Sequence, residues 1–493
     1  MKSASSFHLC EFGSHKPTIL FRQSLAVFMV VAMLGFVIPS PVLAQDADAR
    51  MGGGRVETIY VQSNNPLPNR NAVLAYRHRN NGSLELVGTF RTRGTGAFNP
   101  TDRLGTDDHD QEIIVSPDKR FMFTINQGSN TIAVFNIESN GDLRHVTGSP
   151  FPSGGIGPVS LGLAGNKLYV ANQNENGAQP SFVGRPNYSV FDVALDGSLT
   201  RIPRATINLP RGATPTQALI SPDGRHLFGN RFFARPYTPQ LAPFLPARSS
   251  LLDSFNIGRN GRLDEASGSP FALTDEAAPN PAIPFPAPFP VTDARISLGL
   301  QVHPTRRILY VGFLLGFGVG VYTYNNEGRL NFRRVAPLSD AGICWIVINK
   351  DQTRAYASNA ISNSVSVLDI TDPLFPVQIQ SVSLRLQPDA PMGPFGPVAF
   401  ATTPFQIALD PDSETLYVKN HETITPEGDA KFDPREGYAK GNALHFLNIR
   451  ADGRLEEHPR SPEFLPIPAG AHATGVLVLE QRSSRRRDFR GQN

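Results

Sequence analysis

A short β-rich unit recurs along the chain, and this repetition limits the possible folds more than any other feature of the sequence. The copy at residues 111–143 holds three runs rich in Val, Ile, Phe and Thr. The turn sequence Ser-Pro-Asp-Lys lies between the first two runs, and Ser-Asn-Gly-Asp follows the third. A fourth strand begins at Leu143. A single four-stranded sheet cannot bury both of its faces, so each copy needs neighbouring copies.

Both hairpins of this unit return throughout the sequence. The first hairpin returns as ISPDGRHLFGNR, VHPTRRILYVGF, INKDQTRAYASN and LDPDSETLYVKN, which begin at Ile220, Val302, Ile348 and Leu409. The second hairpin carries a glycine in its turn, and these glycines are Gly82, Gly197, Gly261, Gly328 and Gly453. Glycine suits a turn position with positive φ. Counting the copies gives six full units and one split unit.

The split unit predicts how the repeats close. The segment ETIYVQS at residues 57–63 is a second strand that no first strand precedes, and ATGVLVLE at residues 473–480 can supply the missing strand. Pairing the two ends of a radial array removes its exposed edges. We therefore predict an all-β, seven-bladed β-propeller with four antiparallel strands per blade, whose first blade is closed by the N- and C-terminal strands. An open β-solenoid would not need a lone strand at each end.

The N-terminus has the pattern of a signal peptide over residues 1–44. Basic residues precede an apolar run at residues 25–38, and Val42-Leu43-Ala44 resembles a small-residue cleavage site. A later start or an uncleaved anchor is the alternative. We then expect a linker at residues 45–56, the propeller at 57–480 and a basic disordered tail at 481–493. Export predicts a periplasmic or secreted protein without stable membrane insertion after cleavage.

Composition and motifs exclude several functions. The net charge is only +3, which argues against a nucleic-acid partner. Cys344 is the one cysteine beyond the signal segment and is more typical of a core residue than of a nucleophile. No G-x-S-x-G elbow, Walker loop or H-E-x-x-H motif occurs, so serine hydrolase, nucleotide-dependent and zinc-protease activities lack support. We expect a monomer.

The positions of the long insertions point to one face of the disc. Strand direction alternates within a blade, so second-to-third connections and links between blades share a face. All the long insertions fall in these connections, at residues 173–186, 232–249, 268–294, 384–404 and 421–440. Long loops on one face of a rigid scaffold commonly carry function, although loops also simply tolerate insertion.

Polar residues beside the strand ends at this face should converge on the mouth of the central channel. The candidate catalytic residues are His109, His472, Arg295, Arg231 and Glu422. The candidate ligand-binding residues are Asp108, Asp110, Gln111, Asn172, Gln217, Gln406 and His421. A histidine near a carboxylate can act as a general base, and arginine can hold a carboxylate. Alternatively, the asparagines cap turns and the glutamines link blades.

An acidic cluster lies beside His109. Asp107, Asp108 and Asp110 could hold Ca²⁺ through their oxygens, although their spacing matches no EF-hand loop. A solvated acidic turn explains them equally well. We expect no other cofactor.

The blade motifs resemble those of a known family. At SPDKRFMFTINQGSNTIAVFNIESNGDL, LYVANQ and SPDGRHLFGN, the sequence resembles the seven-bladed propeller lactonases, which include 6-phosphogluconolactonase-like and carboxymuconate cyclase-like proteins. YVTN-type surface and binding propellers share these motifs. The resemblance implies that lactones are opened or closed without an organic cofactor by His, Arg and Glu side chains near the channel mouth, and His109 best resembles a family histidine.

Two functions therefore stay open. The first is an exported lactonase-like enzyme that hydrolyses or forms a lactone of a small sugar- or muconate-type acid. The second is a non-catalytic propeller that binds a protein or polysaccharide with its long-loop face. The signal segment and the large Pro-rich loops depart from the compact members of the family.

Overall fold

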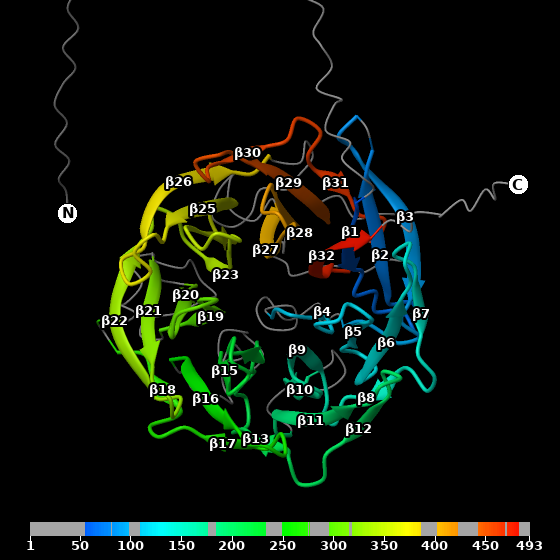
Figure 1. Cartoon of the computed structure of the whole chain (residues 1–493), viewed down its shortest axis with the longest axis vertical. Coiled ribbons are helices and arrows are strands. Elements are labelled where there is room, and N and C mark those ends of the chain that lie inside the picture. The colour runs from blue at the N-terminus through cyan, green and yellow to red at the C-terminus, as the bar shows by residue number, and fades with distance from the viewer. Residues whose placement is uncertain are drawn as a thin grey trace, which may run out of the picture. The chain divides into compact units, whose positions relative to one another are not determined.

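The computed structural model describes residues 55–79, 81–97, 109–175, 184–232, 249–274, 276, 295–314, 318–385, 402–422, 442–468 and 471–482. The secondary structure in these ranges is β-strand with turns and without helices, so no helix there could cross a membrane. The strands form seven antiparallel sheets arranged around a centre (Figure 1). The predicted all-β, seven-bladed propeller is confirmed.

Each blade has four main strands that follow one another from the centre of the ring outward. Blade 1 holds β32 (Thr474–Arg482), β1 (Arg55–Gln62), β2 (Ala72–His78) and β3 (Leu84–Arg91). Blade 2 holds β4 (Ile113–Val115), β5 (Phe121–Asn126), β6 (Thr131–Ile137) and β7 (Leu143–His145), and blade 3 holds β9 (Pro158–Ala164), β10 (Lys167–Asn172), β11 (Asn187–Val193) and β12 (Leu199–Arg201). Blade 4 holds β14 (Leu219–Ile220), β15 (His226–Arg231), β16 (Leu251–Ile257) and β17 (Leu263–Glu265).

Blades 5 to 7 follow the same plan. Blade 5 holds β19 (Ser297–Val302), β20 (Ile308–Phe313), β21 (Gly318–Tyr324) and β22 (Leu330–Pro337), and blade 6 holds β23 (Ile343–Ile348), β24 (Arg354–Asn359), β25 (Ser364–Asp369) and β26 (Val377–Ser383). Blade 7 holds β27 (Thr402–Leu409), β28 (Thr415–Glu422), β29 (Ala443–Ile449) and β30 (Leu455–Glu457). In four blades a short additional strand pairs with the third strand, as the fourth strand does: β8 (Phe151–Pro152), β13 (Ile207–Asn208), β18 (Phe271–Ala272) and β31 (Glu463–Phe464).

The ring closes as the split repeat predicted. Strand β32 pairs antiparallel with β1, and Ile59 lies opposite Val478. The register shifts by one residue between Val61 and Gln62, where a β-bulge bends the pair. Because β32 is the innermost strand of blade 1, the C-terminal segment lines the centre of the ring beside strands from the N-terminal region (Figure 1).

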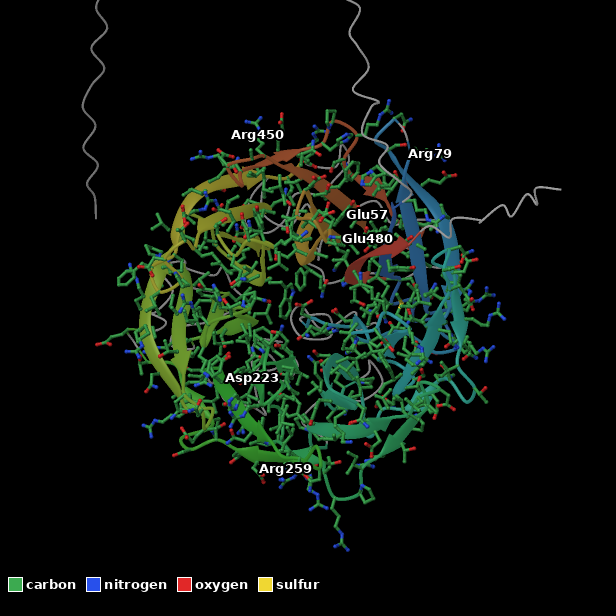
Figure 2. The ribbon with its side chains drawn as sticks, in the orientation of Figure 1. Glu57, Arg79, Asp223, Arg259, Arg450 and Glu480 are labelled. Atoms are coloured by element: carbon green, nitrogen blue, oxygen red, sulfur yellow. The ribbon has the colours of Figure 1, made fainter. Side chains whose placement is uncertain are left out.

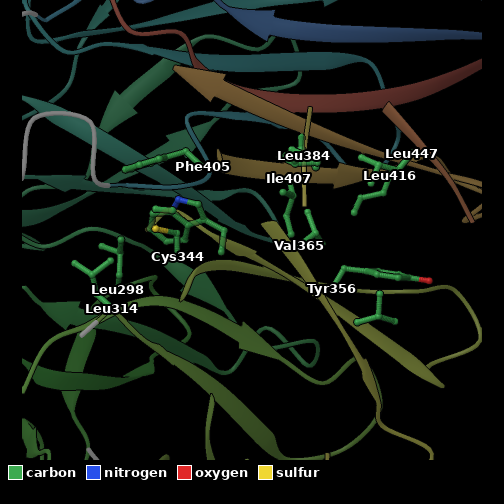
Figure 3. Packing of buried hydrophobic residues seen from close by; sticks show 14 of the residues in the cluster. Leu298, Leu314, Cys344, Tyr356, Val365, Leu384, Phe405, Ile407, Leu416 and Leu447 are labelled. Atoms are coloured by element: carbon green, nitrogen blue, oxygen red, sulfur yellow. The ribbon is translucent and has the colours of Figure 1, made fainter. Parts of the chain in front are cut away.

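The hydrophobic core lies between adjacent blades. Alternate strand residues point to the two faces of each blade, and each face packs on the next blade. One such core joins Tyr356 and Val365 of blade 6 to Ile407 and Leu416 of blade 7 (Figure 3). The predicted core residue Cys344 is buried in this cluster. A repeating unit that is unstable alone is therefore stabilised by its neighbours.

Tyrosine hydroxyls tie successive blades together. Tyr169 of blade 3 donates its hydroxyl to the carbonyl of Gly261 in blade 4 at 3.0 Å, and Tyr356 of blade 6 does the same to Gly453 in blade 7 at 3.0 Å. The accepting glycines have φ values of 78° and 82°. These two turn glycines thus present a carbonyl to the preceding blade, which couples the two hairpins of the repeat across these two interfaces.

Candidate functional site

Residues 109–112, directly before the innermost strand β4, connect blade 2 to three other blades. The carbonyl of His109 accepts a hydrogen bond from Nε2 of Gln406 in blade 7. The N–H of Asp110 donates to the carbonyl of Thr216, before β14 of blade 4, at 3.3 Å. The carbonyl of Gln111 accepts from the N–H of Leu161 in blade 3 at 3.0 Å. These contacts hold the segment among blades 3, 4 and 7, and the side chain of His109 exposes no surface there.

The segment needs an unusual backbone to make these contacts. Gln111 has a φ of 65°, in the left-handed region that non-glycine residues rarely adopt. Such a conformation costs on the order of 1 kcal/mol and persists where surrounding contacts hold it. The turn at Gln111 places Asp110 and Glu112 on either side of it.

His109 and Glu112 form a buried pair. Nδ1 of His109 lies 2.6 Å from Oε1 of Glu112, and both side chains are 0% exposed. A carboxylate at this distance favours the tautomer in which Nδ1 carries the proton and Nε2 is the basic atom. Nε2 of Gln406 also donates to Oε1 of Glu112, at 2.7 Å. The same carboxylate oxygen therefore accepts two hydrogen bonds.

The closing strand of the ring packs directly on this pair. Gly475 in β32 has a φ of 60°, and a Cβ atom there would lie 3.2 Å from Cβ of Glu112. The site is thus assembled from blade 2, blade 7 and the C-terminal strand of blade 1. The innermost strands of these blades, β4, β27 and β32, lie around the centre in Figure 1.

Asp110 has a carboxyl group that stays protonated near neutral pH. Surrounding protein atoms desolvate it and the nearby charge of Glu112 repels its anion, which together raise the pKa of Asp110 to about 8. His109 and the buried amine of Lys419 in β28 act in the opposite direction. A neutral carboxyl beside a His–Glu pair can donate a hydrogen bond or a proton, so the cluster holds both an acid and a base.

Two members of this cluster were not anticipated from the sequence. Glu112 directly follows the segment from which the candidates were taken, and a His-x-x-Glu spacing could have indicated it. Lys419 is 0% exposed, and its Nζ lies 5.1 Å from the centroid of the Phe405 ring. It follows the buried residues Leu416, Tyr417 and Val418 in β28, and the sequence there offers no sign that its charge acts on Asp110.

Arg231 lies in a different environment. Its Nε and Nη2 atoms bind Asp253 at 3.0 and 2.8 Å within blade 4, and Nη2 lies 3.7 Å from Glu265 in the outermost main strand. Burial raises the pKa of Asp253 to about 6, although the Arg231 guanidinium opposes that rise. The described contacts of Arg231 are those of a buried ion pair inside one blade.

Two predicted ligand-binding residues make structural hydrogen bonds. The amide of Asn172 donates to Asn187 and Ser189 at 3.1 Å within blade 3. Gln217 of blade 4 donates to the carbonyl of Leu300 at 3.1 Å and accepts from its N–H at 2.9 Å, which links blade 4 to blade 5. These contacts match the alternative roles of turn stabilisation and inter-blade linkage.

The remaining candidates lie at the predicted strand ends. Arg295 is half-buried before β19, where its carbonyl accepts from Ser250 at 2.7 Å. His472 is buried before β32, between two alanines whose backbones bind Asn442. His421 and Glu422 extend β28, and their side chains lie outside the described residues.

The calcium hypothesis stays a prediction. Asp107 and Asp108 lie outside the described residues, as do the predicted signal peptide and residues 483–493 of the predicted tail, whereas Gln481 and Arg482 of that tail belong to β32. Among the side chains that are described, no group of three or more His, Cys, Asp or Glu residues is arranged to hold a metal ion.

The opposite face carries a separate cavity. Its volume is about 620 Å³, and it lies between the tight turns of blades 6 and 7, with Lys350, Asp412 and Arg450 in its lining. Lys350 and Asp412 pair there at 2.7 Å. The cavity is open and lined by mixed charges, and none of its lining residues belongs to the His109 cluster.

Comparisons with known proteins confirm the resemblance inferred from the blade motifs. Residues 65–181 match the family model described as lactonase, 7-bladed beta-propeller. The matched range includes His109, Asp110 and Glu112. No curated protein sequence matches the chain.

Solved structures share the fold at low sequence identity. A periplasmic gluconolactonase from Pseudomonas aeruginosa is 14% identical, with a TM-score of 0.58 over 86% of this chain and 99% of its own. A candidate 6-phosphogluconolactonase from Bacteroides fragilis is 13% identical, with a TM-score of 0.54 over 86% and 98%. A hypothetical selenium-binding protein from Sulfolobus tokodaii is 13% identical, with a TM-score of 0.54 over 87% and 94%. Proteins with different names share this ring, so the fold alone does not assign an activity.

Proposed function

We propose that this propeller, which resembles the seven-bladed lactonases, is a lactone hydrolase that acts at the mouth of its central channel. The observation that carries the proposal is the 2.6 Å contact between Nδ1 of His109 and Oε1 of Glu112, beside a carboxyl group of Asp110 whose pKa is about 8. A base and a neutral acid within four consecutive residues suit a reaction that takes a proton from water and gives one to an alkoxide.

The proposed reaction proceeds in two steps. Nε2 of His109 accepts a proton from water while the water oxygen bonds to the lactone carbonyl carbon. The ring C–O bond then breaks, and the leaving ring oxygen takes a proton from Asp110. His109 finally returns its proton to the Asp110 carboxylate, so water and lactone give one hydroxy acid. Glu112 stabilises the imidazolium, and the charge of Lys419 favours the transient Asp110 anion.

The substrate class is a lactone of a small sugar- or muconate-type acid, and the reverse, lactone-forming reaction uses the same groups. We further propose export to the periplasm or the medium. The apolar run at residues 25–38 and the Val42-Leu43-Ala44 site support export. The fold shared with a periplasmic gluconolactonase is compatible with that location.

The burial of His109 and Glu112 supports a second candidate function, that of a non-catalytic binding propeller. His109 and Glu112 expose no surface, so substrate reaches Nε2 only if the mouth opens. A non-catalytic propeller that binds a protein or polysaccharide with its long-loop face would not need such access.

The test is hydrolysis of glucono-1,5-lactone and muconolactone by the chain lacking residues 1–44. We expect hydrolysis above background that is lost in His109→Ala and kept in His458→Ala, which alters a half-buried histidine after the outermost main strand of blade 7. Equal rates for the parent chain and His109→Ala would overturn the enzymatic proposal and leave the binding function favoured.

A further inference from the structure

We propose that Gln406 is a positioning residue that holds the His109–Glu112 pair in its reactive arrangement from the opposite side of the ring closure. This inference rests on the proposed function, because it assigns Gln406 a role in the reaction rather than only in folding. It replaces direct ligand contact, which sequence position alone suggested, with an action through Glu112.

The geometry places one amide against two members of the site. Nε2 of Gln406 donates to the backbone carbonyl of His109 and to Oε1 of Glu112, the latter at 2.7 Å. Oε1 of Glu112 is also the atom that lies 2.6 Å from Nδ1 of His109. Gln406 is 0% exposed and comes from blade 7, 294 residues from Glu112. One neutral donor therefore fixes the carboxylate oxygen that orients the imidazole.

The local backbone presents this side chain. Strand β27 has a register shift between Pro404 and Ile407, which is a β-bulge in its pairing with β28. Bulges redirect side chains and are common beside active sites. The bulge lets Gln406 reach across β32 to blade 2.

The side-chain oxygen Oε1 distinguishes Gln406 from a glutamine that has a purely structural role. Gln62 links blade 1 to blade 2 with both ends of its amide: Nε2 donates to the carbonyl of Ile125 at 2.6 Å, and Oε1 accepts from Thr124 at 2.8 Å. Oε1 of Gln406, in contrast, is buried without a hydrogen-bond partner among the described residues. A buried polar atom without a partner has given up its hydrogen bonds to water and gained none in return, which lowers stability. Gln406 thus accepts a stability cost that Gln62 avoids, while its donor group is directed at an ionisable pair.

Removal of the Gln406 amide should change the tautomer and the protonation of the His109 ring as well as the stability of the fold. A carboxylate that loses one of its two donors can rotate, and its charge then acts on the imidazole alone. The Nδ1–H tautomer should be less uniformly populated, and the protonated ring should be favoured over the neutral base. A linker between blades would not have this effect, since it does not touch Glu112.

The experiment compares Gln406→Leu with Gln62→Leu in the chain lacking residues 1–44. Both changes replace a fully buried, inter-blade amide with an apolar side chain of similar size. The first readout is the ¹⁵N spectrum of labelled histidine, with the His109 signals assigned through His109→Ala. The second is the pH profile of lactone hydrolysis.

We expect Gln406→Leu to move the ¹⁵N shifts of His109 toward a mixed tautomer. In hydrolysis, it should lower kcat about tenfold with a smaller change in KM and move the acidic limb of the profile to higher pH. Gln62→Leu should lower thermal stability without these changes. Unchanged His109 shifts in folded Gln406→Leu, or equal shifts in both variants, would overturn the inference. A parent chain without lactonase activity counts against the proposed function alone, because the histidine spectrum still decides the role of Gln406.

Discussion

The Nδ1 atom of His109 lies 2.6 Å from Oε1 of Glu112, and neither side chain exposes any surface. A histidine–carboxylate pair removed from water interacts more strongly than one on the surface, because little solvent screens it. The pair sits where four blades meet through residues 109–112, so its geometry depends on the closed ring. Substitutions in the pair, in its neighbours and in the closing strands should therefore have separable effects.

Replacement of Glu112 by Gln should lower kcat for lactone hydrolysis by about 100-fold or more, because a neutral amide neither fixes the Nδ1–H tautomer nor stabilises the imidazolium. Steady-state kinetics measure the loss. Glu138→Gln is the control, since Glu138 makes a surface pair with Arg144 at 3.1 Å. A Glu112→Gln variant with parental kcat would remove Glu112 from the mechanism.

Hydrolysis should decline as the pH rises through about 8, the pKa to which burial and Glu112 raise Asp110. The carboxyl is the proton donor only while it is protonated, so the active form is lost on the alkaline side. Asp110→Asn should flatten that limb and reduce the maximal rate about tenfold or more, since an amide donates a hydrogen bond but no proton. An alkaline limb that persists in Asp110→Asn would contradict this assignment.

Gly475→Ala should disturb the closing strand and Glu112 together. Its φ of 60° costs a side chain about 1–2 kcal/mol, and the added Cβ would lie 3.2 Å from Cβ of Glu112. Gly165→Ala is the matched control, with a φ of 58° and no atom within 4 Å of the added Cβ. Denaturant unfolding should show a greater loss for Gly475→Ala, and only that variant should lose lactonase activity. Equal losses of stability and unchanged activity would mean that the contact with Glu112 is unimportant.

The β1–β32 pair that closes the ring should contribute less to the stability of the fold as the pH rises between about 4.5 and 7. Glu57 in β1 lies directly opposite Glu480 in β32 (Figure 2), and burial, Asp410, Asp412 and Glu480 raise the pKa of Glu57 from 4.5 to about 7. A folded-state pKa above the unfolded value means that the folded chain binds the extra proton, so stability is lost as the pH rises through this window.

Glu57→Gln should therefore raise the free energy of unfolding at pH 8 by on the order of 1 kcal/mol. Solvent screening at this half-buried site keeps the value that small. It should have little effect at pH 4.5. Thermal unfolding at several pH values gives both comparisons. If the variant and the parent chain show parallel pH profiles, Glu57 does not cause the dependence.

Tyr169→Phe should cost about 1 kcal/mol, because the carbonyl of Gly261 loses its inter-blade donor. Tyr322→Phe provides the comparison, since the hydroxyl of Tyr322 is buried without a partner among the described residues and its removal should be neutral or stabilising. Chemical denaturation measures the two free energies of unfolding. Similar values for both variants would show that the hydroxyl contact adds nothing.

The sequence predicted the ring because its information is local and repeated. Runs such as LYVAN and turns such as Asp-Gly specify hairpins within about a dozen residues, and identical hairpins must stack in the same way. It also predicted that His109, Asp110, Gln111 and Gln406 converge, and the structure joins Gln406 to the segment that holds His109 through two hydrogen bonds.

The partners of those residues were harder to predict. Arg231 occupies the predicted strand end but pairs with Asp253 in the same blade, since strand alternation directs both side chains to one face. Gln217 and Gln406 precede or enter inner strands of different blades, yet Gln217 binds the backbone of Leu300, whereas Gln406 binds a backbone carbonyl and also the side chain of Glu112. Inter-blade packing decides such choices, and a repeat pattern does not encode it.

The sequence alone determined the seven blades, their four strands and the closure of β1 on β32, because hydrophobic alternation and turn residues act over short distances. Only the tertiary structure decided that Glu112 contacts His109, that the charge of Lys419 acts on Asp110 and that Gln406 binds Glu112 from 294 residues away. These contacts form where several blades converge, and burial there changes the charges and hydrogen bonds that each side chain can keep.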